Sequence, residues 1–232
     1  MELTIINASP RGEKGASATV VNDFISYVND VNADISIKNM LLKDSMQQDC
    51  LAEIKHSSNI MFVFPLYFDS LPGNLVESLE YIRDNREAFG ENKNVSVIVN
   101  CGLHEAVQTS LAIEMIKMWT REMEYNFVVA AGFGGGGALT GARKIPVGEG
   151  VKKYMKAFFD KIIDCLCSDF SDIKHEDSKE KCSNDNIYAT IDMPRDEYIK
   201  MSELGWRKLI IRNGLEEKDL DRRIGVEDLC RG

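Results

Sequence analysis

Residues 3–19 read LTIINASPRGEKGASAT, a segment that indicates the fold class. Its first five residues form a short, apolar, β-branched run of the kind found in buried strands. A loop containing glycine and serine follows, and a helical apolar stripe runs from Ser17 to Val28. A buried strand that leads through a short loop into a helix is the opening unit of a parallel α/β sheet.

The same alternation continues through the first 170 residues. Three more apolar runs are predicted as strands, at 60–64, 95–99 and 127–131, and the alternating residues 34–38 are predicted as an edge strand exposed on one face. Helical stripes follow them, at 50–56, 75–83, 111–119 and 151–165. The continuous apolar strands need cover on both faces. The pattern therefore predicts an α/β fold with a doubly wound, five-stranded parallel sheet in the flavodoxin-like order 2-1-3-4-5.

The composition changes after residue 170. Residues 1–170 form the predicted sheet domain, and residues 171–186 are rich in serine, aspartate and lysine, which indicates a polar linker. Residues 187–232 are expected to form a C-terminal helical extension. Pro194 begins its helix, and Asn213-Gly214 ends it because both residues tolerate a left-handed backbone.

Charge and composition exclude several classes of protein. The 232 residues carry 28 Lys and Arg against 37 Asp and Glu, a net charge of −9, which argues against a general binder of nucleic acid or acidic lipid. The chain starts without a signal core, and its most apolar stretch, 60–68, is far shorter than the roughly 20 residues that span a bilayer. The six cysteines and three histidines show no metal-ligand spacing. We expect a cytoplasmic protein with no membrane span and no metal site.

The loop after the first strand has the composition of a phosphate cradle. Gly12 and Gly15 let the backbone turn so that N–H groups converge at the start of the helix. Hydroxyls at positions 9, 17 and 19 add donors, and Arg11 adds a planar cation. The carboxyl end of the first strand adjoins the switch point of an open sheet, where ligands bind. The alternative is a solvent-exposed turn in which Ser17 caps the helix.

Two later segments reach the same edge of the predicted sheet. Tyr67 and Phe68, at the end of the strand at 60–64, offer faces and edges to a flat ring, although core packing would also explain them. Gly102 would let backbone N–H groups approach such a ring, unless it only forms a turn. The glycine run 132–137 formally matches G-x-G-x-x-G but follows the last strand, so we expect a flexible loop near the ligand.

The loop 9–19 and the segment 64–75 (FPLYFDSLPGNL), in this order, resemble the NAD(P)H-dependent FMN reductase family over residues 1 to about 165. The resemblance implies FMN as cofactor and NADPH or NADH as electron donor. The residues that it assigns to FMN are Ser9, Arg11, Ser17, Ala18 and Thr19 at the phosphate, Pro65, Leu66, Tyr67, Phe68 and Ser70 along the ribityl chain and ring, and Asn100, Cys101 and Gly102 at the pyrimidine edge. Ala8 and Ala16 depart from the glycine and asparagine usual in the family.

The resemblance also implies the activity. Hydride would pass from a nicotinamide to the flavin, and electrons would pass on to a small-molecule acceptor such as a flavin, a quinone, or an azo or nitro compound. No side chain is assigned as an essential acid or base. The family commonly forms homodimers, and the C-terminal extension could support a dimer or cover the flavin. Arg143 and Lys144 are candidates for a dinucleotide phosphate.

Two other functions remain open at this point. A flavodoxin-type electron carrier would bind FMN without reacting directly with NAD(P)H. A flavodoxin-like sensing or interaction module would keep the fold and lack the cofactor, and the departures at Ala8 and Ala16 favour it.

Overall fold

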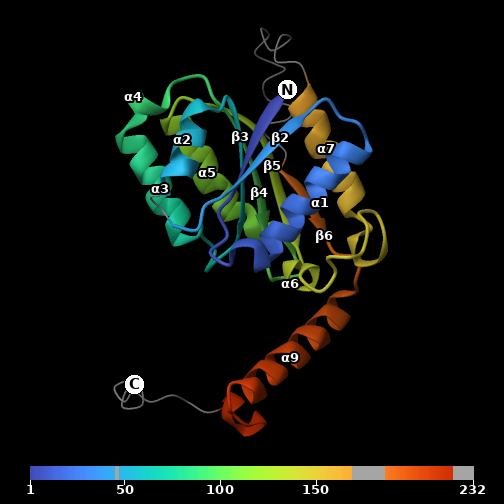
Figure 1. The fold of residues 1–232 in the computed structure, drawn as a ribbon. Coiled ribbons are helices and arrows are strands. Elements are labelled where there is room, and N and C mark those ends of the chain that lie inside the picture. Colours follow the sequence, from blue (N-terminus) through green and yellow to red (C-terminus); the bar gives the residue numbers. More distant parts are fainter. Residues whose placement is uncertain (45–46, 169–185, 222–232) are drawn as a thin grey trace, which may run out of the picture. The chain divides into compact units, whose positions relative to one another are not determined.

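The structure is a computed structural model that describes residues 1–44, 47–168 and 186–221 (Figure 1). Its strands are β1 (Glu2–Asn7), β2 (Ser36–Leu41), β3 (Asn59–Pro65), β4 (Asn94–Asn100), β5 (Asn126–Gly134) and β6 (Ile187–Thr190). Its helices are α1 (Ala16–Asp30), α2 (Gln48–His56), α3 (Gly73–Asp84), α4 (Arg86–Phe89), α5 (Ser110–Glu122), α6 (Gly136–Leu139), α7 (Met155–Cys167) and α9 (Arg195–Arg212). Short 3-10 segments are η1 (Gly12–Lys14), η2 (Ala106–Thr109), η3 (Gly150–Lys152) and η5 (Glu217–Asp221).

The strands form one sheet in the order β2-β1-β3-β4-β5-β6, and every neighbouring pair is parallel. The first five strands therefore have the predicted order 2-1-3-4-5, which is that of flavodoxin-like sheets. The chain leaves β1 toward β2 on one side and returns to β3 on the other. The switch point of the sheet consequently lies between the carboxyl ends of β1 and β3.

The prediction of five strands is wrong, because β6 adds a sixth at the edge beside β5. The prediction placed these residues in the helical extension. β6 has only four residues, so its pattern is too short to stand out from the sequence. Its place depends on a distant glycine: a side chain on Gly132 would come within 2.7 Å of the Tyr188 ring. The position of β6 was thus decided by tertiary packing.

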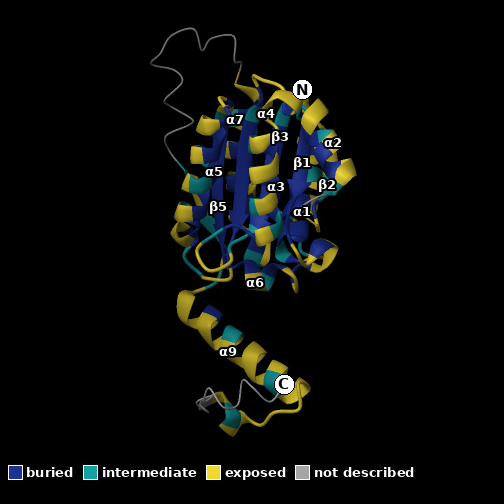
Figure 2. Ribbon diagram, turned by 90° about the vertical axis from the view of Figure 1, so that its left-hand side faces the viewer, coloured by how far each residue is buried: buried dark blue, intermediate teal, exposed yellow. Residues whose placement is uncertain are grey.

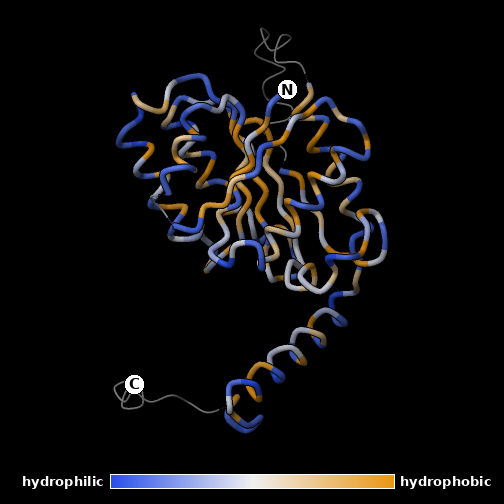
Figure 3. Tube along the Cα trace, viewed as in Figure 1, coloured by the Kyte–Doolittle hydropathy of each residue, from blue (hydrophilic) through white to orange (hydrophobic). Residues whose placement is uncertain are grey.

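Helices cover both faces of the sheet, as the continuous apolar strands require (Figure 1). On one face, α2, α3 and α5 pack on the strands through a single apolar cluster that contains Phe62, Leu75 and Ile113. On the other face, α1 and α7 meet through Phe24 and Phe159, whose ring centroids lie 5.2 Å apart. The inner strands β1, β3, β4 and β5 are almost wholly buried (Figure 2) and mainly hydrophobic (Figure 3), whereas the edge strands β2 and β6 are partly exposed.

The chain divides into two compact units, Met1–Asp192 and Met193–Gly232. In the second unit, α9 begins after Pro194 and ends at Arg212, with Asn213 as its C-cap and Gly214 following at φ +79°, as the sequence predicted. The predicted linker at 171–186 lies outside the described residues except for its last position.

Candidate functional site

Three segments that the sequence singled out meet at the switch point of the sheet. The Ala8 N–H donates to the Val63 carbonyl at 2.9 Å, which holds the start of the loop 8–15 beside β3. The Leu66 N–H donates to the Asn100 carbonyl at 2.8 Å, which ties the end of β3 to the end of β4. The carboxyl ends of β1, β3 and β4 therefore form one surface, where an open sheet binds its ligands.

The loop 8–15 folds back on itself before α1 begins. The Gly12 N–H donates to the Ser9 carbonyl at 2.9 Å, and the Gly15 N–H donates to the Gly12 carbonyl at 3.2 Å. Gly12 has φ +56°, a left-handed conformation that favours glycine. Gly15 is the N-cap of α1, and no side chain of the described residues caps this helix end. The first N–H groups of α1 are thus left to an external acceptor such as an anion.

The Ser9 hydroxyl lies against this helix end. Ser9 is 1% exposed, and its Oγ has no hydrogen-bond partner among the described residues. A side chain at Gly15 would bring a Cβ within 2.8 Å of that Oγ, so the glycine leaves the space that the hydroxyl occupies. The Thr19 hydroxyl is also buried without a partner in the described part of the chain. Buried, unsatisfied hydroxyls are rare and point to a missing ligand or water.

Ser17 and Asn100 are joined by a buried hydrogen bond between their side chains. The Ser17 Oγ donates to the Asn100 Oδ1 at 2.6 Å, and both residues are buried. A hydroxyl has a single proton, so the Ser17 side chain cannot donate to a phosphate while this bond exists. The expected contribution of Ser17 to a phosphate site is therefore confined to its backbone N–H. The bond also joins the segment predicted for the phosphate to the segment predicted for the ring.

Cations from separate parts of the chain surround the loop 8–15. Arg11 is exposed on the loop itself. The Lys43 Cε lies 3.0 Å from the place that a Cβ on Gly12 would take, and the Arg143 Nη2 donates to the Glu13 carbonyl at 3.0 Å. In a chain with net charge −9, this local gathering of positive charge favours an anionic ligand.

The segment after β3 forms a tight turn with an exposed aromatic tip. Tyr67 and Ser70 exchange two backbone hydrogen bonds, each of 3.0 Å. The two residues between them are both left-handed, with φ +49° at Phe68 and +58° at Asp69, as in a type I′ turn. Such turns favour Asn-Gly, and a bulky residue there is strained. Phe68 is fully exposed, so core packing does not explain its side chain.

Asn74 positions this edge of the sheet, a role that sequence reasoning missed. Its Nδ2 donates to the Leu42 carbonyl at 2.7 Å and to the Ala8 carbonyl at 3.3 Å. The first turn of α3 is therefore hydrogen-bonded to the residues that directly follow β2 and β1. Its position after Pro72-Gly73 gave only the signal of a helix start.

The segment after β4 begins with a cysteine, Cys101, whose side chain is buried. Cys101 is 2% exposed, and burial raises the pKa of its thiol to about 11. A thiol with that pKa stays protonated at neutral pH, so Cys101 is not a nucleophile. Gly102 is exposed, and apart from its two chain neighbours no atom of the described residues lies within 4 Å of the place a Cβ would take.

The glycine run 132–137 is not the flexible loop that the sequence predicted. Its first residues end β5, and its last residues begin the short helix α6. A Cβ on Gly134 would lie 2.1 Å from the His104 carbonyl oxygen, and one on Gly132 would lie 2.2 Å from the Thr109 Oγ1. The glycines allow β5 to pack closely against the segment 101–109, which is a structural role.

The predicted residues differ in how far they reach solvent. Ser9, Ser17, Ala18, Thr19, Asn100 and Cys101 are buried, Pro65, Leu66 and Ser70 are half-buried, and Arg11, Tyr67, Phe68 and Gly102 are exposed. A ligand at this edge would consequently meet the backbone of the loop and the exposed aromatic turn first.

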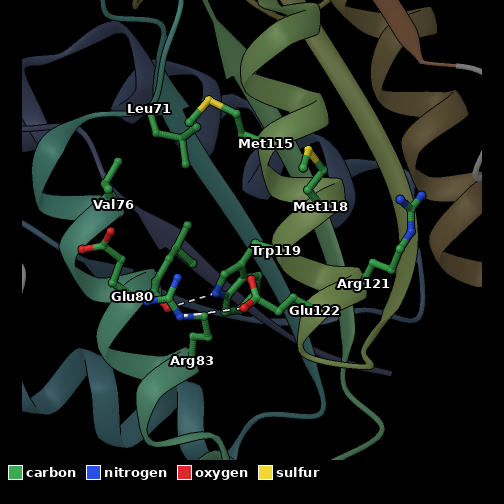
Figure 4. A pocket seen from close by; sticks show the side chains of 10 residues that line it. Leu71, Val76, Glu80, Arg83, Met115, Met118, Trp119, Arg121 and Glu122 are labelled. Atoms are coloured by element: carbon green, nitrogen blue, oxygen red, sulfur yellow. Dashed lines mark hydrogen bonds and ion pairs between the residues drawn. The ribbon is translucent and has the colours of Figure 1, made fainter.

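A groove with a volume of about 520 Å³ lies elsewhere, between α3 and α5 (Figure 4). Its lining contains none of the residues predicted for FMN. Among the described residues, no helix combines the length and apolar character needed to cross a membrane. The described residues also hold no group of three or more His, Cys, Asp or Glu placed to bind a metal ion.

No protein-family model matches the chain, and no curated protein sequence matches it. Among solved structures, an FMN-dependent NADH-azoreductase from Bacillus anthracis in complex with FMN is similar at 14% identity and a TM-score of 0.46, over 70% of this chain and 100% of that one. An NADPH-quinone reductase from P. pentosaceus is similar at 16% identity and a TM-score of 0.41, over 55% and 81% of the two chains. A flavodoxin from Streptococcus pneumonia is similar at 12% identity and a TM-score of 0.39, over 56% and 81%. The similarity is one of structure alone and assigns no function to this chain.

Proposed function

We propose that this chain is an FMN-dependent NAD(P)H oxidoreductase. The observation that carries the proposal is the buried, unpartnered Ser9 hydroxyl beside the uncapped start of α1, at the switch point of the sheet. An ester phosphate there would accept hydrogen bonds from that hydroxyl and from the first N–H groups of α1. Each hydrogen bond to a charged group contributes about 1.5–3 kcal/mol, whereas the helix dipole adds about 0.3–1 kcal/mol.

The remaining residues fit the other parts of FMN. The exposed aromatic turn at Tyr67 and Phe68 offers a flat apolar surface to a ring. The exposed backbone at Gly102 leaves its neighbourhood open to the polar edge of the same ring. The cations at Arg11 and Arg143 would neutralise the phosphate, and the second of them stays fixed by its bond to the Glu13 carbonyl.

The chain's contribution to the reaction is binding and orientation. Bound FMN would supply the redox chemistry, taking hydride from NADPH or NADH and passing electrons to a small acceptor. The phosphate anchor and the aromatic turn would fix the ring at the open edge of the sheet, where a nicotinamide can reach it. Cys101 keeps its proton at neutral pH and supplies no thiolate nucleophile.

The visible absorption spectrum of the purified protein tests the proposal. We expect flavin bands in the protein as isolated or after addition of FMN, and we expect NADPH or NADH to bleach them without air. Ser9→Ala should weaken FMN binding about tenfold through loss of one charge-assisted hydrogen bond. Lys161→Glu, an exposed change on α7, serves as the control. A protein that takes up no FMN at micromolar concentration would overturn the proposal.

A sensing or interaction module without cofactor is the second candidate. The bond between Ser17 and Asn100 favours it, because it occupies a donor that the resemblance assigns to the phosphate. The same FMN titration separates the two candidates. An electron carrier would bind FMN but would show no reduction when mixed rapidly with NADPH or NADH.

A further inference from the structure

The start of α1 gathers more buried polar groups than the one hydroxyl that carries the proposed function. The Ser9 and Thr19 hydroxyls are both buried without a partner in the described part of the chain. The Asn100 amide lies beside the same helix end, because its Oδ1 accepts a hydrogen bond of 2.6 Å from the Ser17 Oγ. Ser17 is the second residue of α1, and Asn100 is the last residue of β4.

The nitrogen of this amide is unused. Asn100 is 3% exposed, and no oxygen of the described residues accepts a hydrogen bond from its Nδ2. An amide nitrogen carries two protons, so Asn100 keeps two donors without an acceptor. A donor in a buried residue is costly unless a ligand or a water molecule supplies the acceptor.

Ser17 determines which end of the amide is left for a ligand. A hydroxyl that donates to Asn100 has to meet the carbonyl oxygen, because the nitrogen is itself a donor. The Nδ2 lies on the other side of the amide, 3.3 Å from the place that a Cβ on Gly136 would take. Gly136 begins α6, which packs against α1 (Figure 1). A side chain at this position would crowd the amide nitrogen, and glycine leaves that space open.

The resemblance assigned the Ser17 hydroxyl to the phosphate and Asn100 to the ring, but the Ser17 proton is committed to Asn100. We propose that Asn100 binds the anion at the start of α1 through its Nδ2, and that Ser17 is the positioning residue that holds this amide in the donating orientation. The proposal rests on the anion site of the proposed function and adds a binding residue to it. An asparagine amide is then present at this site although position 16 is alanine.

The charge of this corner favours an anionic acceptor for the amide. Arg11 is exposed on the loop 8–15, and Arg143 is held beside it by its bond to the Glu13 carbonyl. Positive charge from two segments of the chain therefore surrounds the helix end that Ser17 belongs to. A hydrogen bond to an ionised oxygen is about twice as strong as one to a neutral oxygen, so a phosphate gains most from the unused donors.

Titrations of the full chain with FMN and with riboflavin test the proposal, because riboflavin lacks the phosphate. Asn100→Asp keeps an acceptor for the Ser17 hydroxyl and replaces the donor by an oxygen. We expect it to raise the Kd for FMN at least about tenfold, through loss of a charge-assisted bond and repulsion of the phosphate. The Kd for riboflavin should stay within about twofold of the wild-type value.

Asn94→Asp is the matched control. Asn94 is the first residue of β4, and its Nδ2 donates to the Asn59 Oδ1 at 2.8 Å. The same substitution there also removes a side-chain hydrogen bond, but at the opposite end of the strand. Both dissociation constants should remain unchanged. Should circular dichroism show that Asn100→Asp does not fold, Asn100→Ala removes the donors without adding charge and should raise the Kd for FMN about 3–10-fold.

NMR gives a readout that a merely structural role would not move. The paired side-chain N–H resonances of Asn100 are identified by their loss in Asn100→Asp. We expect them to shift on titration with inorganic phosphate, and not with chloride at equal ionic strength. In Ser17→Ala the amide can turn over, so the shift should shrink and the Kd for phosphate should rise about 3–10-fold.

Several results would overturn the proposal. An equal loss of affinity for riboflavin and FMN in Asn100→Asp would place the amide at the ring instead. Wild-type affinity for FMN in that variant, or Asn100 resonances that ignore phosphate, would refute the contact while leaving the proposed function intact. A wild-type chain that binds phosphate through Asn100 but takes up no FMN would support the contact and refute the proposed function. A chain that binds neither ligand would refute both.

Discussion

The aromatic turn after β3 can be replaced by the sequence that its backbone favours. Phe68 and Asp69 both have positive φ, which costs an ordinary residue about 1–2 kcal/mol and costs aspartate less. The double variant Phe68→Asn/Asp69→Gly supplies the Asn-Gly pair of type I′ turns. Phe68 is fully exposed, so its removal loses no buried apolar area. We expect the free energy of unfolding to rise by about 1.5 kcal/mol and the Tm by about 3–6 °C for a chain of this size.

The same variant should lose affinity for FMN while it gains stability. An aromatic contact with the ring contributes about 0.5–1.5 kcal/mol, so its loss should raise the Kd about 3–10-fold. Urea unfolding followed by circular dichroism gives the stability, and fluorescence titration gives the Kd. Strain retained at an exposed aromatic tip is expected where the tip contacts a ligand.

Glu124→Gly is the control for this experiment. Glu124 is also left-handed, with φ +58°, and lies in the turn between α5 and β5. Its exposed ion pair with Arg86 contributes little. We expect a gain in stability with no change in FMN affinity. A fall in stability of the turn variant would refute the strain argument, and an unchanged Kd would refute the contact with the ring.

Three further predictions concern buried polar groups. Asn100→Ala leaves the Ser17 hydroxyl without its acceptor and should lower the free energy of unfolding by about 1–3 kcal/mol. The double variant with Ser17→Ala should lose less stability than the sum of the losses in the two single variants. Strict additivity of these losses would contradict the hydrogen bond. Lys152→Met strips the fully buried partner from Asp23, 2.7 Å away, and should cost about 3–5 kcal/mol at neutral pH. Burial raises the pKa of Asp23, so this carboxylate takes up a proton more readily in the folded protein than in the unfolded chain. The stability lost in Lys152→Met should therefore shrink as pH falls through that pKa. A loss that is constant with pH would argue against an unpaired Asp23 charge as its cause. Iodoacetamide at pH 8 should leave Cys101 unmodified in the native protein and modify it after denaturation, because its pKa is about 11; peptide masses report the outcome, and rapid native labelling would disprove the burial argument.

Local sequence patterns were sufficient to predict most elements of the sheet domain. Apolar runs mark β1, β3, β4 and β5, and stripes of period 3.6 mark the longer helices that follow them, because both signals are local in the chain. The order of the first five strands also followed from the sequence, since right-handed crossovers leave few alternatives. The loop 8–15 was placed correctly at the switch point for the same reason.

Contacts between residues far apart in the sequence became visible only in the folded chain. β6 joins the sheet because Gly132 leaves room for Tyr188, and the glycine run packs instead of forming a loop. The hydrogen bond between Ser17 and Asn100 joins residues 83 positions apart, so no local sequence pattern could predict it. The left-handed backbone at Phe68 is set by the two hydrogen bonds that close its turn, against the preference of the residue itself. The periodicity of a helix or strand depends on residues that are close in the sequence. Contacts across the fold depend instead on the space that distant segments leave free.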